Sequence, residues 1–102
     1  MMFTPRYQNE QTDHLIEALL ALENTEEAYR FLEDVLTIQE MKSITQRLEV
    51  AVMLRNKETY QEIVRKTGAS TTTIGRVNRA LQYGADGYAA VLDRLAEKAQ
   101  EK

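Results

Sequence analysis

The stretch TYQEIVRKTGASTTTIGRVNRALQY, residues 59–83, decides the fold of this chain. Thr59 and Glu62 have the spacing of a capping box, which begins a helix. Gly68 stands where a tight turn needs a positive φ, a conformation that other residues tolerate poorly. Ser70 is a good N-cap for a second helix. A short helix, a turn that contains glycine and a second helix together predict a helix-turn-helix.

The second helix of this motif has two different faces. Its inner face is apolar at positions i, i+3 and i+7: Ile74, Val77 and Leu81. At about 100° per residue, the opposite face carries a small hydroxyl, two cations and an aromatic ring: Thr72, Arg76, Arg79 and Tyr83. Gly75 lowers the stability of the helix by roughly 1 kcal/mol, and its small size could let another surface approach closely. The face suits a recognition helix in a DNA major groove, although a helical hairpin with a solvated charged face would share the pattern.

The length and composition predict one small domain without disulfide bonds or thiolate metal sites. A chain of 102 residues buries a modest core, so we expect two chains to share one. There is no Cys, which excludes disulfides and thiolate metal sites. No apolar run has the form of a signal peptide or of a membrane span. We therefore expect a cytoplasmic protein, associated with the nucleoid when it binds DNA.

Positive charge gathers on the helix-turn-helix, although the whole chain has a net charge of −3. Residues 1–54 hold four Lys or Arg and ten Asp or Glu, a net charge of −6. Residues 55–83 hold six cations against two acids, a net charge of +4, and residues 84–102 have a net charge of −1. A basic motif on an acidic body is the distribution expected of a local DNA-binding surface.

The chain before the motif predicts an arm followed by helices. We expect residues 1–8 to form a flexible arm and residues 9–102 to form a single helical domain. A helix from about Asn9 to Leu22 has a wide apolar face that suits packing either between two subunits or inside its own subunit. Thr25 is expected to cap a second helix.

A long helix follows, and another one ends the chain. Thr37 and Glu40 have capping-box spacing and predict a helix through about Arg55. Its segment 50–54 is apolar on all sides, so it should be central and buried. After the motif, the last helix is expected from about Gly87 to Gln100. The sequence thus predicts an all-α fold with six helices and no convincing strand.

Motifs of catalysis and of cofactor binding are missing from the sequence. It has no Gly-rich phosphate loop, no HExxH, no CxxC and no nucleophile motif. Acidic pairs such as Glu26-Glu27 are typical of solvated helix faces rather than of acid/base pairs. His14, the single histidine, has no pattern of partners. We therefore expect neither an enzyme nor a metal or cofactor.

Residues 36–81 resemble the Trp repressor family, and most of all its smaller YerC/YecD-like branch. The similarity is densest in Tyr60-Gln61-Glu62-Ile63, in Gly68-Ala69, and in Thr73-Ile74 with Arg76 and Leu81. The family implies an interlocked, all-helical homodimer whose N-terminal helices wrap around the partner subunit. It also implies a transcriptional regulator that presents two helix-turn-helix units to successive major grooves.

The resemblance also implies an effector pocket, with differences here. The family holds tryptophan between an Arg of the central helix and an Arg of the recognition helix. Arg76 matches the second of these. The first falls at or near Leu48, beside Arg47, and Val77 replaces a Gly. We therefore do not expect tryptophan to act as co-repressor.

The sequence-based hypothesis is a sequence-specific regulator that binds a double-stranded DNA operator as a homodimer. The residues expected to contact bases or phosphates lie on both helices of the motif: Gln61, Arg65, Lys66, Ser70, Thr71, Thr72, Thr73, Arg76 and Arg79. Two alternatives stay open: a protein-interaction module whose same face binds an acidic partner, and a sensor of a small molecule other than tryptophan.

Overall fold

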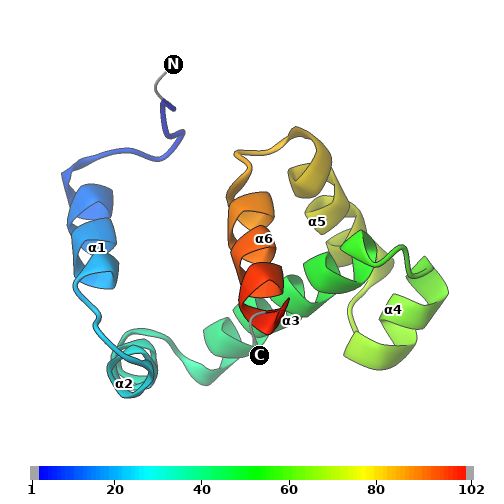
Figure 1. Cartoon of the computed structure of the whole chain (residues 1–102), viewed down its shortest axis with the longest axis horizontal. Helices are drawn as coiled ribbons and strands as arrows, with labels where there is room; N and C mark the ends of the chain where they lie inside the picture. Colours follow the sequence, from blue (N-terminus) through cyan, green and yellow to red (C-terminus); the bar gives the residue numbers. More distant parts are fainter. Residues whose placement is uncertain (1–2, 101–102) are drawn as a thin grey trace. The chain divides into compact units, whose positions relative to one another are not determined.

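The computed structural model describes residues 3–100, and all regular secondary structure in that range is α-helix (Figure 1). The six helices are α1 (Glu10–Leu20), α2 (Thr25–Val35), α3 (Ile38–Arg55), α4 (Tyr60–Thr67), α5 (Thr71–Tyr83) and α6 (Gly87–Gln100). The predicted all-α fold with six helices is confirmed. The chain divides into two compact units, Met1–Ile38 and Gln39–Lys102. No helix among the described residues is both long enough and apolar enough to span a bilayer.

The first unit holds α1 and α2, and an asparagine caps each helix. The side chain of Asn9 accepts a hydrogen bond from the backbone N–H of Thr12 at 2.8 Å. The side chain of Asn24 accepts one from the N–H of Glu27 at 2.9 Å. The prediction that Thr25 caps α2 is therefore wrong by one residue, because the Asn24 amide oxygen reaches the third N–H and Thr25 is already helical. No described residue of these two helices is buried within the chain.

The second unit is built on α3, whose C-terminal half lies in the core. Val50 and Ala51 are 0% exposed and Met53 is 7% exposed, while Val52 and Leu54 pack against the same cluster. The predicted burial of the apolar segment 50–54 is thus confirmed. The core is completed by residues from the turn and from the three following helices: Ile63, Ala69, Ile74, Val77 and Leu92.

A tight reversal ends α3 and sets the start of α4. The N–H of Glu58 bonds to the carbonyl of Met53 at 3.1 Å, and the N–H of Lys57 bonds to that of Leu54 at 3.1 Å. This pair of bonds is a Schellman motif, which needs a left-handed residue just after the helix. Lys57 takes that conformation with φ 65°. The chain therefore turns directly from the buried α3 into the helix-turn-helix.

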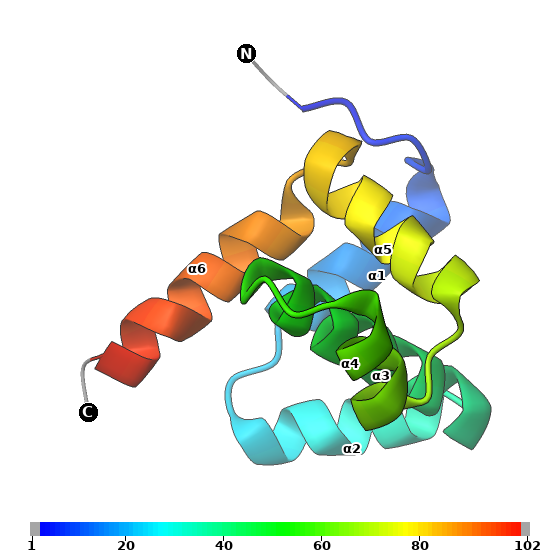
Figure 2. The ribbon, with the colours of Figure 1, turned by 90° about the vertical axis from the view of Figure 1, so that its right-hand side faces the viewer.

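The last helix, α6, is attached to α3 by polar and apolar contacts. Leu92 is 8% exposed and belongs to the core. The guanidinium of Arg55 lies 2.6 Å from the Oδ1 of Asp93 and donates to the carbonyl of Ala89 at 3.5 Å. These contacts fix α6 against the end of α3. Figures 1 and 2 show α4 and α5 as two separate short helices after the α3 reversal.

Candidate nucleic-acid interface

The helix-turn-helix forms as the local sequence predicts. Thr59 Oγ1 accepts a hydrogen bond from the N–H of Glu62 at 3.2 Å and caps α4. Gly68 ends α4 in the left-handed conformation, with φ 73°. Ser70 Oγ accepts from the N–H of Thr73 at 3.1 Å and caps α5. All three assignments are confirmed, because each depends on residues no more than four positions apart.

The turn between α4 and α5 is also held by bonds that the sequence did not predict. The Thr67 hydroxyl donates to the carbonyl of Ile63 at 2.7 Å and accepts from the N–H of Ala69 at 3.1 Å. The carbonyl of Thr67 accepts from Gln46 Nε2 of α3 at 3.2 Å. The turn is therefore fastened to α3 and to its own preceding helix.

The two helices of the motif share a buried contact and a polar one. Ile63 of α4 and Ile74 of α5 are both 0% exposed. The phenol oxygen of Tyr60 accepts a hydrogen bond from Asn78 Nδ2 at 3.4 Å. Because α4 and α5 are joined by this apolar contact and by this hydrogen bond, the orientation of α5 relative to α4 is fixed. A recognition helix needs such a fixed orientation in order to enter a DNA groove in one way.

The outer face of α5 carries polar side chains that make no hydrogen bond or ion pair with any described residue. The side chains of Thr72, Arg76 and Arg79 are exposed, and within residues 3–100 none of them has a hydrogen bond or an ion pair. Tyr83, farther along the same face, is 82% exposed. We call Thr72, Arg76 and Arg79 the α5 face. Its two guanidinium groups keep their full hydrogen-bonding capacity for another molecule.

The other candidate residues differ in whether their side chains have partners in the chain. Ser70 and Thr73 bond to each other at 3.1 Å between hydroxyl oxygens, in addition to the cap. Thr71 and Gln61 are exposed, and no described residue bonds to their side chains. The motif thus has hydroxyl groups of two kinds: those that hold the start of α5 and those that project from it.

The two cations of α4 are paired with acids of the same motif. Arg65 lies 2.8 Å from a Glu62 carboxylate oxygen, and Lys66 lies 2.9 Å from one of Glu58. The hydrogen bond from Arg65 holds the pKa of the Glu62 carboxyl below its usual 4.5, and the same bond raises the pKa of Arg65. Glu62 is therefore ionised at neutral pH and offsets part of the positive charge of α4. The unpaired positive charge of the motif is concentrated on α5.

A small hollow lies beside the α5 face, between α3, α5 and α6, and Arg76 borders both. It has a volume of about 240 Å³, and its lining includes both arginines of the expected effector pocket, with Val77: Arg47, Thr73, Arg76, Val77, Ala80 and Tyr88. Leu48 instead lines a neighbouring groove of about 590 Å³ with Ile44, Tyr88 and Val91. Of the four residues expected at an effector pocket, three lie together here, and Arg47 rather than Leu48 supplies the α3 side chain.

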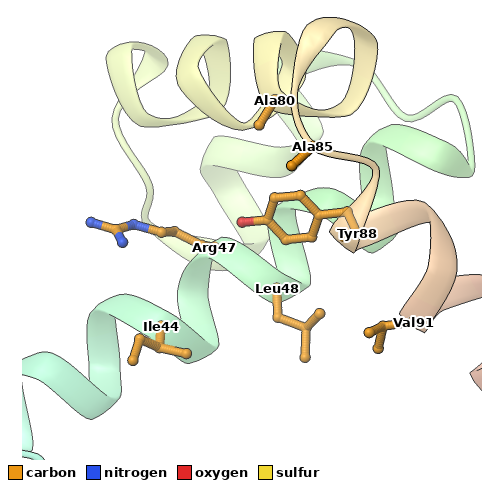
Figure 3. Close-up of a pocket in the computed structure, with 8 residues that line it drawn as sticks. Ile44, Arg47, Leu48, Ala80, Ala85, Tyr88 and Val91 are labelled. Carbon is orange, nitrogen blue, oxygen red and sulfur yellow. The ribbon is translucent and has the colours of Figure 1, made fainter. Parts of the chain in front are cut away.

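Tyr88 of α6 stands between the hollow and the groove and lines both. Figure 3 shows its ring in the middle of the site, with the hydroxyl pointing toward Arg47. The sequence did not single out Tyr88. Its place beside the two arginines depends on how α6 packs on α3 and α5, which no local pattern encodes.

Comparison with known proteins places this geometry among Trp repressors. The family model described as Trp repressor protein matches residues 10–96. The uncharacterised protein YerC of Bacillus subtilis (strain 168) is 48% identical over 96 residues, which cover 94% of this chain and 92% of YerC. A TrpR-like protein from Eubacterium eligens ATCC 27750 has a TM-score of 0.84 and 53% identity, covering 87% of this chain and 92% of its own. A candidate Trp repressor from Staphylococcus aureus has a TM-score of 0.83 and 46% identity, covering 87% and 89% of the two chains.

Proposed function

We propose, since the chain belongs to the Trp repressor family, that it is a sequence-specific DNA-binding transcriptional regulator. The observation that carries the proposal is the α5 face: two arginines and a threonine, exposed and without partners among the described residues, on a helix held by its own motif. Trp repressors are regulatory DNA-binding proteins rather than enzymes, so the chain is not an enzyme. The function of YerC is uncharacterised, so the proposal rests on the family and on this surface.

The proposed contacts follow from the position of each side chain. The N-terminal turn of α5 enters the major groove, where Thr71, Thr72 and Arg76 approach base edges. Arg79, about one turn farther along, contacts a phosphate. The hydroxyl groups of Ser70 and Thr73 bond to each other and so are not directed at bases. We assign these two residues to holding the start of α5 against the DNA backbone.

The α4 side of the motif positions the DNA backbone. Gln61 is exposed without a side-chain partner among the described residues, while Arg65 and Lys66 already have acidic partners. We therefore assign Gln61, Arg65 and Lys66 to phosphate contacts, and we expect α4 to contribute less electrostatic affinity than α5. Contacts of this kind set the register of the protein on the duplex without reading its sequence.

We propose that the protein binds as a homodimer. A two-fold dimer presents two α5 helices, and in motifs of this class the half-sites lie about one helical turn, roughly 34 Å, apart. The operator is therefore expected to be a pseudo-palindrome. The support within this chain is the apolar surface that each unit leaves exposed on α1 and on α6.

The decisive experiment is selection of fragments of genomic DNA by the purified protein, followed by titration of the best fragment and a scrambled duplex at several salt concentrations. A regulator prefers one pseudo-palindromic sequence and loses affinity steeply as salt rises. A protein that selects no sequence, but retains an acidic protein partner on the same face, would instead be an interaction module.

We further propose that L-tryptophan is not the co-repressor. Val77 and Tyr88 both line the hollow together with Arg47 and Arg76, and side chains of this size leave less room for the aromatic ring of a ligand. Calorimetry is expected to show no binding at sub-millimolar tryptophan. Tight binding would mean that Tyr88 moves aside and that the two arginines clamp the ligand carboxylate.

A sensor of another small molecule is the second candidate. The favouring observation is that two arginines, Arg47 and Arg76, line one hollow of about 240 Å³. Such a pair suits a small anion such as a carboxylate. A rise in melting temperature with one compound of a metabolite panel, lost in Arg47→Ala, would support this candidate.

A further inference from the structure

We propose that Gly75 is a specificity-determining position, where the backbone of α5 comes into direct contact with the edge of a base pair in the major groove. This inference rests on the proposed function, since it names one contact of the same DNA surface. It adds that a missing side chain, and not only the arginines and threonines around it, selects the sequence.

The conformation of Gly75 does not require a glycine. Gly75 lies inside α5, the helix Thr71–Tyr83, and has no positive φ. In this it differs from Gly68, which ends α4 with φ 73°. An alanine would adopt the backbone angles of Gly75 and would favour the helix more strongly.

Packing inside the chain does not require a glycine at this position either. A methyl group built on Gly75 meets no heavy atom of the chain within 4 Å. At Gly84, by contrast, such a methyl would clash with the carbonyl oxygen of Ala80. The room beside Gly75 is therefore open, and whatever needs this space lies outside the chain.

The neighbours of Gly75 identify the occupant of that space as DNA. Thr72 precedes Gly75 by three residues and Arg79 follows it by four, so both lie beside it on one side of the helix. The two flanking side chains are exposed and have no partner among the described residues. A polyanion complements the cation, and a base edge complements the hydroxyl.

The dimensions of the groove explain why a methyl group would matter. The major groove is about 12 Å wide, and a helix with its side chains has a diameter of roughly 10–12 Å. A helix that fits so closely moves toward the base pairs only where its side chains are short. Thr72 has a short side chain and reaches a base only if the backbone beside it is close. Gly75 permits that approach, and a methyl at Gly75 would push the helix outward.

The test is Gly75→Ala, compared with the parent protein on the selected operator and on a scrambled duplex. We expect the melting temperature to rise by a few degrees, since alanine favours the helix. We expect operator affinity to fall by about tenfold or more, while affinity for the scrambled duplex stays within about threefold. A variant that is more stable but binds its operator less tightly separates a DNA contact from a structural role.

Gly87→Ala is the matched control. Gly87 begins α6, and a methyl built on it also meets nothing within 4 Å, but it lies outside the helix-turn-helix. This variant is expected to bind the operator as the parent does. Replacing each operator thymine in turn by deoxyuridine then identifies the neighbour, because a base that has lost its methyl should restore binding of Gly75→Ala if that methyl was the obstacle.

Other results would overturn the inference or the proposed function. Unchanged operator binding by Gly75→Ala overturns the inference and leaves the proposed function intact. An equal loss of affinity for the operator and the scrambled duplex, or a loss shared by Gly87→Ala, also overturns it. A change in the mass of the protein in solution would assign the open space to a partner subunit instead. If the parent selects no duplex, the proposed function itself fails.

Discussion

Lys57 adopts a backbone conformation that its side chain disfavours. It occupies the left-handed position of the Schellman motif after α3, with φ 65°. A left-handed conformation costs an L-residue other than glycine roughly 1–2 kcal/mol. We expect Lys57→Gly to raise the free energy of unfolding by about 0.5–1 kcal/mol, which urea denaturation measures.

Lys57→Ala is the control, because it removes the same charge and keeps the strained conformation. It is expected to leave stability close to that of the parent protein. A gain shared by the two variants would mean that charge repulsion around Lys57, and not its backbone, is the source of the effect.

The Glu62–Arg65 pair makes a second prediction, about acid stability. Because the pKa of Glu62 is lower in the folded chain than its usual 4.5, the pair stabilises the fold above that pH. Its contribution is lost as the pH falls through the lowered pKa. We expect Glu62→Gln to flatten the fall in melting temperature below pH 4.5. Between about pH 6 and 8, any difference from the parent should not vary with pH.

Arg65→Gln removes the other member of the pair and is expected to flatten the acid profile in the same way. Melting curves of the two single variants and the double variant measure this. If the flattening in the double variant is the sum of the two single effects, Glu62 and Arg65 contribute to acid stability independently and the pairing is wrong.

At the residue scale, the sequence predicts what neighbouring residues determine. Thr59, Gly68 and Ser70 act as expected because each meets a partner within one helical turn. The cap of α2 was misplaced because Asn24 and Thr25 are both good capping residues, and only geometry decides between them. The bond from Gln46 to Thr67 joins residues 21 positions apart, and no local pattern encodes it.

At the scale of elements, α5 is the helix on which the function is expected to depend. Thr72 and Arg76 lie at the N-terminal half of the α5 face, where a recognition helix meets base edges. We expect Thr72→Ala or Arg76→Ala to change which sequences are preferred, at roughly 1–3 kcal/mol for each lost base contact. Titration of each variant against a panel of specific and scrambled duplexes measures this.

Arg79 lies farther along α5 and is expected to act differently. Arg79→Ala should weaken binding to all duplexes alike and lower the salt slope by about one unit. Melting curves provide the control, because the three side chains are exposed while Ile74 and Val77 form the buried side of α5. If all three variants bind the operator as the parent does, the α5 face does not read DNA.

The elements themselves were predictable, whereas the hollow beside α5 was only partly so. Periodicity and caps predicted all six helices, with the cap of α2 wrong by one residue, because both are local signals. The resemblance placed the α3 position of the pocket at or near Leu48, beside Arg47, and it is Arg47 that lines the hollow with Arg76. Which of two adjacent α3 residues lines the hollow depends on how α6 packs beside α3. Tyr88 of α6 lines both the hollow and the groove, so α6 forms part of the wall of each.

At the scale of the whole molecule, each unit leaves apolar side chains exposed. On α1, Leu15 is 45% exposed, Ile16 is 48% exposed and Leu20 is 81% exposed. On α6, Val91 and Leu95 are about half exposed. Burying such side chains stabilises by roughly 1.5–3 kcal/mol each, which favours contact with another apolar surface. A second copy of the chain, which carries the same faces, is the surface we propose.

The last prediction tests that shared core through α1. Light scattering is expected to give about twice the 11.7 kDa of one chain, and the melting temperature should rise with protein concentration. Leu20→Glu should lower the mass toward that of one chain, because it places a charge on the most exposed apolar residue of α1. Gln11→Glu adds the same charge on the opposite side of this helix, nine residues away, and should leave the mass unchanged. If the parent melts at one temperature at every concentration and scatters as one chain, its apolar faces pack within the chain. In that case two α5 helices would not be joined, and the expectation of a pseudo-palindromic operator would fall with the dimer.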